Sequence, residues 1–310
     1  MAPSLRDEST LTVVIAFGAN LLIAVAKSIA ALVTGSASIA AEVAHSWADT
    51  GNEVFLYVAE RRSSRAKDAT HPLGYGREAY VWSMYAAFGL FAAGAAVSIL
   101  HGVQSLADPE PATDWAVAYA VLAVAFVLEG VSFVRAYRQA RAAAQQRGTG
   151  TLQSVLASSN PTLRAVFAED AAALIGLSIA FLGVLLHQVT GSPVYDAIGS
   201  ILVGVLLGVV AVVLINRNRR FLVGQETDPA VSRSMVAFLN ARDEIERVTY
   251  LHLEFVGASR VFLVAAVDLV GDDSESNVAV ALRTVETALE RNPHIEKAVL
   301  TLSVPADAAL

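Results

Sequence analysis

The 310-residue sequence contains no cysteine. Disulfide bonds, thiolate-ligated zinc sites and thiol redox chemistry are therefore excluded for this chain. Charged residues are also scarce, at 16% against 55% hydrophobic residues, and the mean hydropathy is +0.53. An ordinary soluble protein carries about 25% charged residues. The composition therefore indicates a multi-pass membrane protein whose main partner is the lipid bilayer.

Six apolar windows are each long enough to cross about 30 Å of hydrocarbon as a helix. They cover residues 11–33, 37–60, 79–105, 113–137, 162–187 and 194–215. Because the first window is long and is followed at once by a second, we do not interpret it as a cleaved signal peptide. We expect residues 1–221 to form an all-α, six-helix transmembrane transport domain.

Residues 222–310 have the pattern of a soluble domain. Asp228-Pro229 is typical of a helix N-cap with Pro at the first helical position, and this helix is expected to end near residue 241. The expected elements after it are strands at 246–256 and 260–270, a helix at 275–291 and a strand at 295–302. The order αββαβ predicts a cytoplasmic α+β domain, ferredoxin-like or metallochaperone-like, with both helices on one face of the sheet.

Basic residues are concentrated in alternate connections: after the second window, in the 138–160 linker, and after the sixth window. The 106–114 loop instead holds Asp108, Glu110 and Asp114 and no basic residue. Since positive side chains stay cytoplasmic, we expect both termini in the cytoplasm, in a plasma (inner) membrane. The net charge of −7 is then divided between a basic membrane-facing belt and an acidic soluble domain. No nucleic-acid partner is indicated.

The second window carries polar residues that are unusual for a membrane helix. His45 and Asp49, at positions i and i+4, stand on one helix face. Ionisable groups at this depth are costly and indicate a functional site, although a polar seam that locks helices together is an alternative. Glu42 is expected to pair with Lys27 of the first window, unless Lys27 snorkels to the outer interface.

The fifth window contains adjacent carboxylates, Glu169 and Asp170, followed by small residues that permit a close helix contact. If this helix lies beside the second, Asp170 meets His45 and Asp49. One imidazole and two carboxylates neutralise a divalent cation and favour Zn²⁺, with Co²⁺, Fe²⁺, Cd²⁺ and Mn²⁺ also possible. Because the ligands bind deprotonated, incoming protons can eject the metal, with His45 as the natural proton carrier. The pattern predicts a zinc/proton exchanger in which Zn²⁺ is the substrate and no organic cofactor is used.

Other titratable residues carry weaker indications. Asp68 and His71, in the loop before the third window, either hold a second, weaker metal ion or belong to a capped turn. His101 and Glu129, in the third and fourth windows, are interpreted as interface or packing residues. The sequence contains neither a His-Glu-x-x-His pattern nor a nucleophile and base, so an enzyme is not expected.

The six spans, the His45-x-x-x-Asp49 pattern, the carboxylate in span five and the αββαβ domain together resemble the cation diffusion facilitator family. Residues 42–52 and 71–78 are similar to the branch that includes mitochondrial zinc exporters. The resemblance implies a homodimer held partly by its cytoplasmic domains, alternating access, and export of divalent metal in exchange for protons. It makes His45 and Asp49 the ligands of span two and Asp170 a ligand of span five.

The sequence departs from the family pattern at three places. Val166 occupies the position of the first span-five ligand, so Glu169 or water is the fourth ligand; we favour Glu169, whose side chain must swing about 100° around the helix. Tyr75 replaces a further loop histidine. The zinc positions of some cytoplasmic domains fall on Thr249, Ala265, Thr301 and Ser303, and neither His252 nor His294 replaces them. We therefore expect dimerisation without a metal cluster.

A function of another class is also compatible with the sequence. A non-transporting membrane metal sensor or scaffold would use its cytoplasmic domain to bind partners. It would bind zinc saturably without moving it, and its support is the well-formed C-terminal domain.

Overall fold

The computed structural model describes residues 5–109 and 114–310, so Glu110 of the acidic loop lies outside the described residues. The chain divides into two compact units. One comprises Met1–Ala59 and Val81–Asn218, and the other comprises Glu60–Tyr80 and Arg219–Leu310.

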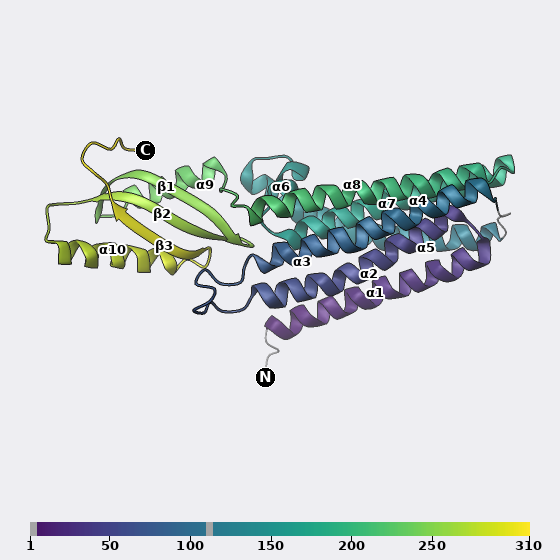
Figure 1. Cartoon of the computed structure of the whole chain (residues 1–310), viewed down its shortest axis with the longest axis horizontal. Coiled ribbons are helices and arrows are strands. Elements are labelled where there is room, and N and C mark those ends of the chain that lie inside the picture. Colours follow the sequence, from purple (N-terminus) through teal and green to yellow (C-terminus); the bar gives the residue numbers. More distant parts are fainter. Residues whose placement is uncertain (1–4, 110–113) are drawn as a thin grey trace. The chain divides into compact units, whose positions relative to one another are not determined.

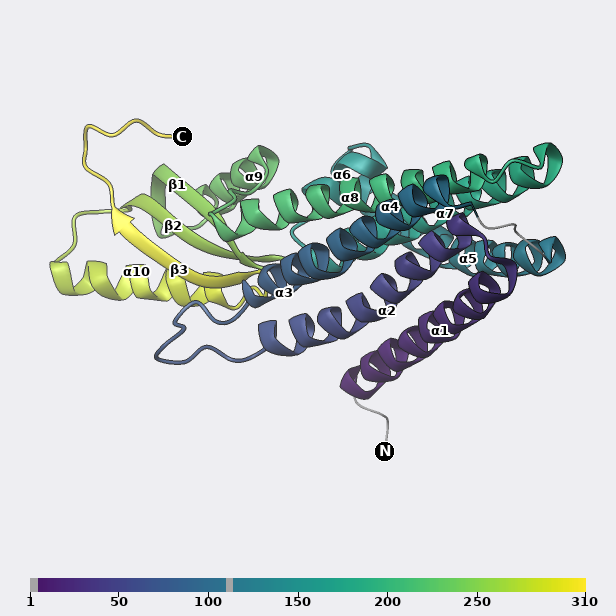
Figure 2. The same cartoon turned by 45° about the vertical axis from the view of Figure 1, so that its right-hand side comes forward.

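Each of the six apolar windows contains helical structure, and these helices run alongside one another (Figure 1; Figure 2). They are α1 (Leu5–Thr34), α2 (Ala37–Ser63), α3 (Glu78–Ala86), continuing through the π-helical turn η1 (Ala87–Phe91) into α4 (Ala92–Ala107), then α5 (Trp115–Arg147), α7 (Pro161–Thr190) and α8 (Val194–Leu222). A short turn joins α1 and α2, and Gly35 there adopts φ +64°, a conformation that glycine tolerates.

Four helical stretches in the described part of the chain are long and apolar enough to cross a membrane. They are Glu78–Ala107, Trp115–Gln145, Pro161–Thr190 and Val194–Leu222. In α1 the described apolar segment is Asn20–Thr34. α2 is 27 residues long, but Glu42, Asp49 and Glu53 lower its hydropathy. The residues that mark α2 as a candidate site are thus the same ones that make it less apolar than its neighbours.

The 138–160 segment, which we expected to be a linker, is largely helical. α5 continues to Arg147, where Gly148 ends it with φ +64°, and α6 (Thr151–Ala157) follows. Residues 138–147 are rich in Ala, Arg and Gln, which are strong helix formers. Gly148 and Gly150 therefore separate two helices and do not begin a long loop. Asn160 then caps α7 by accepting a hydrogen bond from the Leu163 amide at 3.2 Å.

Small side chains allow the helices of the first unit to pack closely. A hydrophobic cluster joins α2, η1–α4, α7 and α8 through Ala48, Ala87, Phe91, Ala95, Ala172, Leu207, Val210, Ala211 and Leu214. A Cβ atom added at Gly102 would lie 2.8 Å from the Ala197 carbonyl oxygen, and one added at Gly204 would lie 2.9 Å from that of Ala95. Such close approach is typical of helices packed through small residues in a membrane.

The second unit confirms the predicted αββαβ order. Its elements are α9 (Pro229–Asn240), β1 (Ile245–Gly257), β2 (Arg260–Leu269), α10 (Glu275–Glu290) and β3 (Ile295–Leu302). The sheet order is β1-β2-β3, with β1 and β2 antiparallel and β2 and β3 parallel. Asp228 caps α9 as expected, accepting a hydrogen bond from the Ala230 amide at 2.8 Å.

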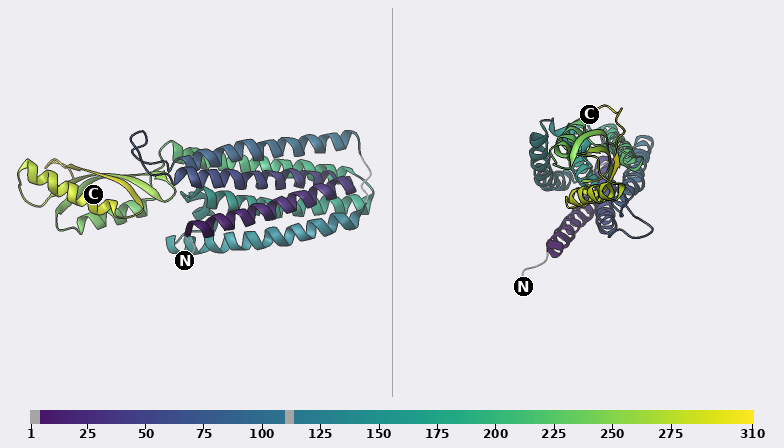
Figure 3. Two further views of the ribbon diagram at one scale, coloured as in Figure 1. Left: turned by 90° about the horizontal axis from the view of Figure 1, so that it is seen from below. Right: turned by 90° about the vertical axis from the view of Figure 1, so that its left-hand side faces the viewer.

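Both helices of this unit cover one face of the sheet, and Figure 3 shows α10, in yellow, running along the strands. Alternate residues Leu263, Ala265 and Val267 of β2 are fully buried, as period-two burial of one face requires. They share one core with Leu239 of α9 and Val285 of α10.

The loop between α2 and α3 packs on β1. A Cβ atom added at Gly76 would lie 2.8 Å from the Gly257 Cα, so only glycine fits this contact. Arg77 forms an ion pair with Glu254, and the Tyr80 ring stacks on Phe221 with 5.0 Å between centroids. These contacts explain why the loop belongs to the second compact unit.

Candidate metal centre

His45 and Asp49 of α2 form the centre of the candidate site. The His45 Nε2 and Asp49 Oδ2 atoms are 3.5 Å apart, which confirms that the two side chains share a helix face. His45 is 1% exposed and Asp49 is 9% exposed. Within the described part of the chain, His45 Nδ1, His45 Nε2 and Asp49 Oδ1 have no hydrogen-bond partner. Each unpaired buried group costs about 1–3 kcal/mol, so this cluster is suited to a ligand rather than to holding helices together.

α7 lies against this face of α2. A Cβ atom added at Gly176 would collide with Glu42 Oε1 and would lie 3.6 Å from His45 Nδ1. Further along the same helices, the Ser38 hydroxyl donates a hydrogen bond to the Ala180 carbonyl at 3.4 Å. The structure therefore brings the second and fifth windows side by side, the condition on which the predicted site depended.

The two carboxylates of α7 are held by different helices. The Asn52 side-chain amide of α2 donates a hydrogen bond to Glu169 Oε1. The Ser132 hydroxyl of α5 donates a hydrogen bond to Asp170 Oδ2 at 2.8 Å. Both carboxylates are buried. Glu169 is thus the carboxylate joined to α2, while Asp170 is bonded to α5.

The four predicted ligands are not gathered around one point. Among residues 5–109 and 114–310, no group of three or more His, Asp or Glu side chains is close enough to hold a metal ion. His45 and Asp49 are together; Asp170 has a separate hydrogen-bond partner. Sequence reasoning missed that partner, Ser132, because a single serine in an apolar helix usually bonds to its own backbone.

The predicted pair between the first two helices is confirmed. Lys27 Nζ donates to Glu42 Oε2 at 2.9 Å, and the side chains are 1% and 0% exposed. The alternative, that Lys27 snorkels to the interface, is wrong. Outside this pair, Glu42 Oε1 has no hydrogen-bond partner among the described residues, and it lies at the contact between α2 and α7. The pair therefore places a buried positive charge and a partly satisfied carboxylate one turn from His45.

The loop residues Asp68 and His71 lie together in an exposed turn. Asp68 Oδ1 accepts hydrogen bonds from the Thr70 amide, the Thr70 hydroxyl and the His71 amide, and Oδ2 accepts one from the Tyr75 hydroxyl at 2.7 Å. The hydrogen bonds from Thr70 and Tyr75 hold the pKa of Asp68 well below its ordinary value. His71 Nδ1 is 3.6 Å from Asp68 Oδ1, and its ring stacks on Tyr75. These contacts are those of a capped turn, and a metal ion here would have to displace them.

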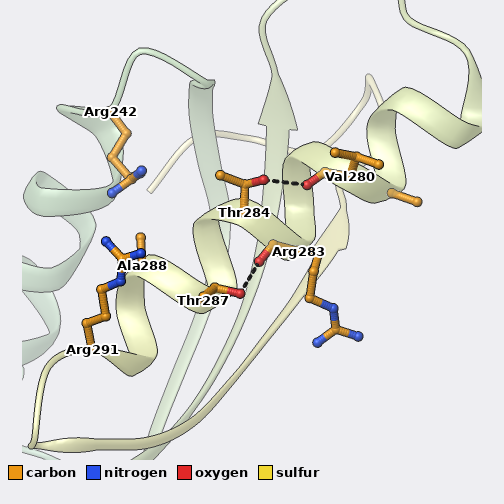
Figure 4. Close-up of a pocket in the computed structure, with 8 residues that line it drawn as sticks. Arg242, Val280, Arg283, Thr284, Thr287, Ala288 and Arg291 are labelled. Carbon is orange, nitrogen blue, oxygen red and sulfur yellow. Dashed lines mark hydrogen bonds between the residues drawn. The ribbon is translucent and has the colours of Figure 1, made fainter.

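Residues 219–310 of the second unit offer little to a cation. The Thr249 and Ser303 hydroxyls, at two positions where some family members bind zinc, are hydrogen-bonded to each other at 2.7 Å. A hollow of about 610 Å³ lies along α10 and is lined by Arg242, Arg283 and Arg291 (Figure 4). Three guanidinium groups repel a divalent cation. That this domain dimerises without a metal cluster stays a prediction.

Comparison with known proteins gives a consistent result. Residues 13–223 match the family model described as "Cation efflux transmembrane domain". The chain is 37% identical over 233 residues to "Metal tolerance protein C4" of Arabidopsis thaliana, covering 75% of this chain and 51% of that protein. It is 34% identical over 245 residues to "Proton-coupled zinc antiporter SLC30A9, mitochondrial" of Mus musculus, covering 79% of this chain and 43% of that protein. The human protein of the same name is 33% identical over 245 residues, with the same coverage of 79% and 43%.

The chain spans about half the length of the curated relatives it matches. The family model covers residues 13–223, from within α1 to the end of α8, including the α2 and α7 residues described above. This coverage, together with the membrane-spanning helices, confirms that the chain is a multi-pass membrane protein and not an enzyme. The chain therefore belongs to the cation efflux family, the cation diffusion facilitators.

Proposed function

We propose that this protein exports a divalent metal cation, with Zn²⁺ the favoured substrate, in exchange for protons by alternating access. The observation that carries the proposal is the buried pair His45 and Asp49, which has unpaired polar atoms and in which His45 Nδ1 lies beside Gly176 of α7. An imidazole and carboxylates suit zinc, and protons compete with the metal for the same atoms. The names of the relatives, a metal tolerance protein and proton-coupled zinc antiporters, support the same class of function.

The proposed ligands are His45, Asp49, Asp170 and, as the fourth, Glu169. Asp170 reaches the pair on α2 when its hydrogen bond to Ser132 is released and α7 turns about its axis, the adjacent carboxylates being about 100° apart around the helix. Glu169 is already joined to α2 through Asn52. A site that forms by exchanging such hydrogen bonds matches alternating access, because metal binding then favours one helix arrangement over another. For Asp68 and His71 we favour the capped turn over a second, weaker metal site, because both Asp68 oxygens already accept hydrogen bonds within the loop.

The remaining architecture is proposed from the sequence pattern. Six helices span the bilayer, with both termini in the cytoplasm, and residues 1–221 form the transport domain. Residues 222–310 form a ferredoxin-like domain through which two copies of the chain dimerise. The names of the SLC30A9 relatives refer to mitochondria, so they do not favour the predicted plasma membrane location. The proposal requires only a membrane that carries a proton gradient.

Zinc flux into proteoliposomes with an imposed proton gradient tests this function. Mutating a residue that only supports a metal ligand typically lowers metal affinity or activity about 10–100-fold. Asp49→Ala and Asp170→Ala remove proposed ligands themselves, so each should lower zinc flux by at least that much. Thr50→Val is the matched control, because the buried Thr50 hydroxyl is bonded to the Ser46 carbonyl of its own helix at 2.8 Å. Full transport by both aspartate variants would disprove the site. Saturable zinc binding by the unmodified protein without flux would indicate a sensor or scaffold instead.

Proton release on zinc binding tests the fourth ligand. If Glu169 binds the metal, Glu169→Gln should lower zinc affinity and change the number of protons released per zinc, because an amide carries no proton to lose. Ser132→Ala is the companion variant: it frees Asp170 from α5 and should leave zinc affinity unchanged or higher. Equal stoichiometry and affinity in Glu169→Gln would exclude Glu169 as a ligand.

A further inference from the structure

A second polar cavity lies in the first unit, away from the candidate metal centre. It has a volume of about 210 Å³ and is formed where the α1–α2 turn, the end of α4 and the α7–α8 turn meet. Its polar lining consists of His101, Gln104, Ser105, Asp108, His187 and Asp196. Two imidazoles and two carboxylates at one cavity are metal-binding groups that the proposed mechanism does not use.

His187 is the most informative of these residues. It is 6% exposed, and its ring packs edge-on against Trp115 with 5.0 Å between ring centroids and an interplanar angle of 81°. The aromatic contact holds the ring, yet Nδ1 is buried with no hydrogen-bond partner in the described ranges. A buried imidazole nitrogen without a partner, at the wall of a polar cavity, is suited to bind a ligand.

Asp196 has a different role in the same cavity. Its carboxylate accepts hydrogen bonds from the Ser36 hydroxyl at 2.9 Å, the Ala37 amide at 2.6 Å, the Ser38 amide at 3.3 Å and the Ser38 hydroxyl. These are donors at the start of α2, so Asp196 caps that helix from α8. It supplies negative charge to the cavity while its oxygens are already occupied. The groups left to bind a cation are His101, His187 and Asp108.

One face of α7 connects this cavity to the candidate metal centre. Gly176 contacts Glu42 and His45, Ala180 accepts a hydrogen bond from Ser38, and a Cβ added at Gly183 would lie 3.1 Å from Ser38 Oγ. His187 follows at the same helical spacing, so these residues share one face of α7. The 11 residues from Gly176 to His187 correspond to a rise of about 16 Å. The polar contact between α2 and α7 therefore begins at the central pair and ends at the cavity.

We propose that this cavity is an exit vestibule in which His101 and His187 bind the transported divalent cation after it leaves the central site. This inference rests on the proposed function. Because no three metal-binding side chains converge anywhere in the described residues, water completes the coordination and binding is weaker than at a closed four-ligand site. Weak binding suits release, and the charge of Asp108 and Asp196 raises the local cation concentration.

The absence of cysteine allows a direct test. His101→Cys introduces one thiol into the cavity of the full-length protein in liposomes, and Zn²⁺ is the probe. At a zinc concentration ten times the dissociation constant, reaction of this thiol with a membrane-impermeant maleimide should slow about tenfold. Protection should persist when Asp49→Ala is added and should be lost when His187→Ala is added. Ser192→Cys, in the α7–α8 turn but outside the cavity lining, is the control and should react equally with and without zinc.

A second measurement leaves His101 unchanged. The chain has three tryptophans, so Trp47→Phe with Trp82→Phe leaves Trp115 as the one fluorophore of this kind, in contact with His187. Co²⁺ should quench its fluorescence saturably, and His187→Ala should abolish the quenching. The vestibule would be disproved if thiol protection and fluorescence quenching persisted in the His187→Ala variant. It would also be disproved if both were lost in the Asp49→Ala variant. Neither readout requires transport: flux without protection would disprove the vestibule alone, and protection without flux would disprove the proposed function alone.

Discussion

Acidic side chains of α10, in the second unit, and of α2, in the first, are held in opposite ways. In α10, Glu286 Oε1 accepts a hydrogen bond from the Leu300 amide at 2.9 Å and Glu290 Oε1 accepts one from the Ala298 amide at 3.2 Å. In α2, Glu42 Oε1 and Asp49 Oδ1 are buried and have no partner among the described residues. The acids of α10 satisfy donors on the free edge of β3, whereas those of α2 remain available.

This difference separates the acids of α10 from those of α2. A satisfied buried carboxylate contributes to folding, while an unsatisfied one lowers stability and is retained where a ligand uses it. Arg242 Nε is the one unpaired buried side-chain atom of the second unit, within its described residues. The first unit, by contrast, has several in one segment of α2. Four variants test whether stability and transport separate in this way.

The largest effect is expected at His45. His45→Leu removes a proposed ligand and should lower zinc flux by more than about 100-fold, the upper range for second-sphere changes. It also removes two unpaired buried nitrogens, so the free energy of unfolding should stay equal or rise by about 1–3 kcal/mol. Flux assays in proteoliposomes and thermal unfolding in detergent measure the two quantities. Normal flux in a strongly destabilised protein would show that His45 is structural and would reverse the comparison.

The next largest effect concerns stability in the first unit. Lys27→Met leaves the Glu42 carboxylate buried without its cation, and breaking such a pair costs about 3–5 kcal/mol. Adding Glu42→Gln removes the uncompensated charge and should restore much of the loss. Thermal unfolding of the single and double variants measures this. If the double variant were no more stable than Lys27→Met, charge burial would not be the cause of the loss.

A smaller loss is expected in the second unit. Glu286→Ala leaves the Leu300 amide without its acceptor and should lower the free energy of unfolding by about 1–3 kcal/mol. Glu286→Gln is the matched control, because the amide oxygen can still accept this bond. Hydrogen exchange at Leu300 should increase in the alanine variant and not in the glutamine variant. Flux per folded molecule should stay unchanged in both; a large loss in either would link this acid to transport.

The smallest effect is expected in the exposed loop. Hydrogen bonds from Thr70 and Tyr75 lower the pKa of Asp68. Their contribution to stability is therefore fully present above about pH 3.9, the ordinary aspartate pKa. It is lost as the pH falls from that value through the lowered pKa of Asp68. Between pH 5 and pH 8 Asp68 stays ionised, so its hydrogen bonds should protect the Thr70 and His71 amides throughout this range. Asp68→Asn should speed exchange at Thr70 and His71 with little change in flux. A marked drop in zinc binding instead would support the loop metal site.

Local spacing predicted the parts of the site that lie on one element or one hairpin. The i, i+4 relation placed His45 beside Asp49, and the short turn at Gly35 placed Lys27 opposite Glu42. In the second unit, the cap at Asp228 and the order of helices and strands were also predicted from the sequence. These features follow from backbone geometry over a few residues, which the sequence determines by itself.

The tertiary structure decided which buried group meets which. It placed Asn52 on Glu169, Ser132 on Asp170, and His187 beside Trp115 at the second cavity. The sequence marks each of these residues as polar within an apolar helix, but it does not state the rotation of α7 against α2 and α5. That rotation depends on how small residues such as Gly176 allow distant helices to approach, and it is set by packing between helices rather than within one.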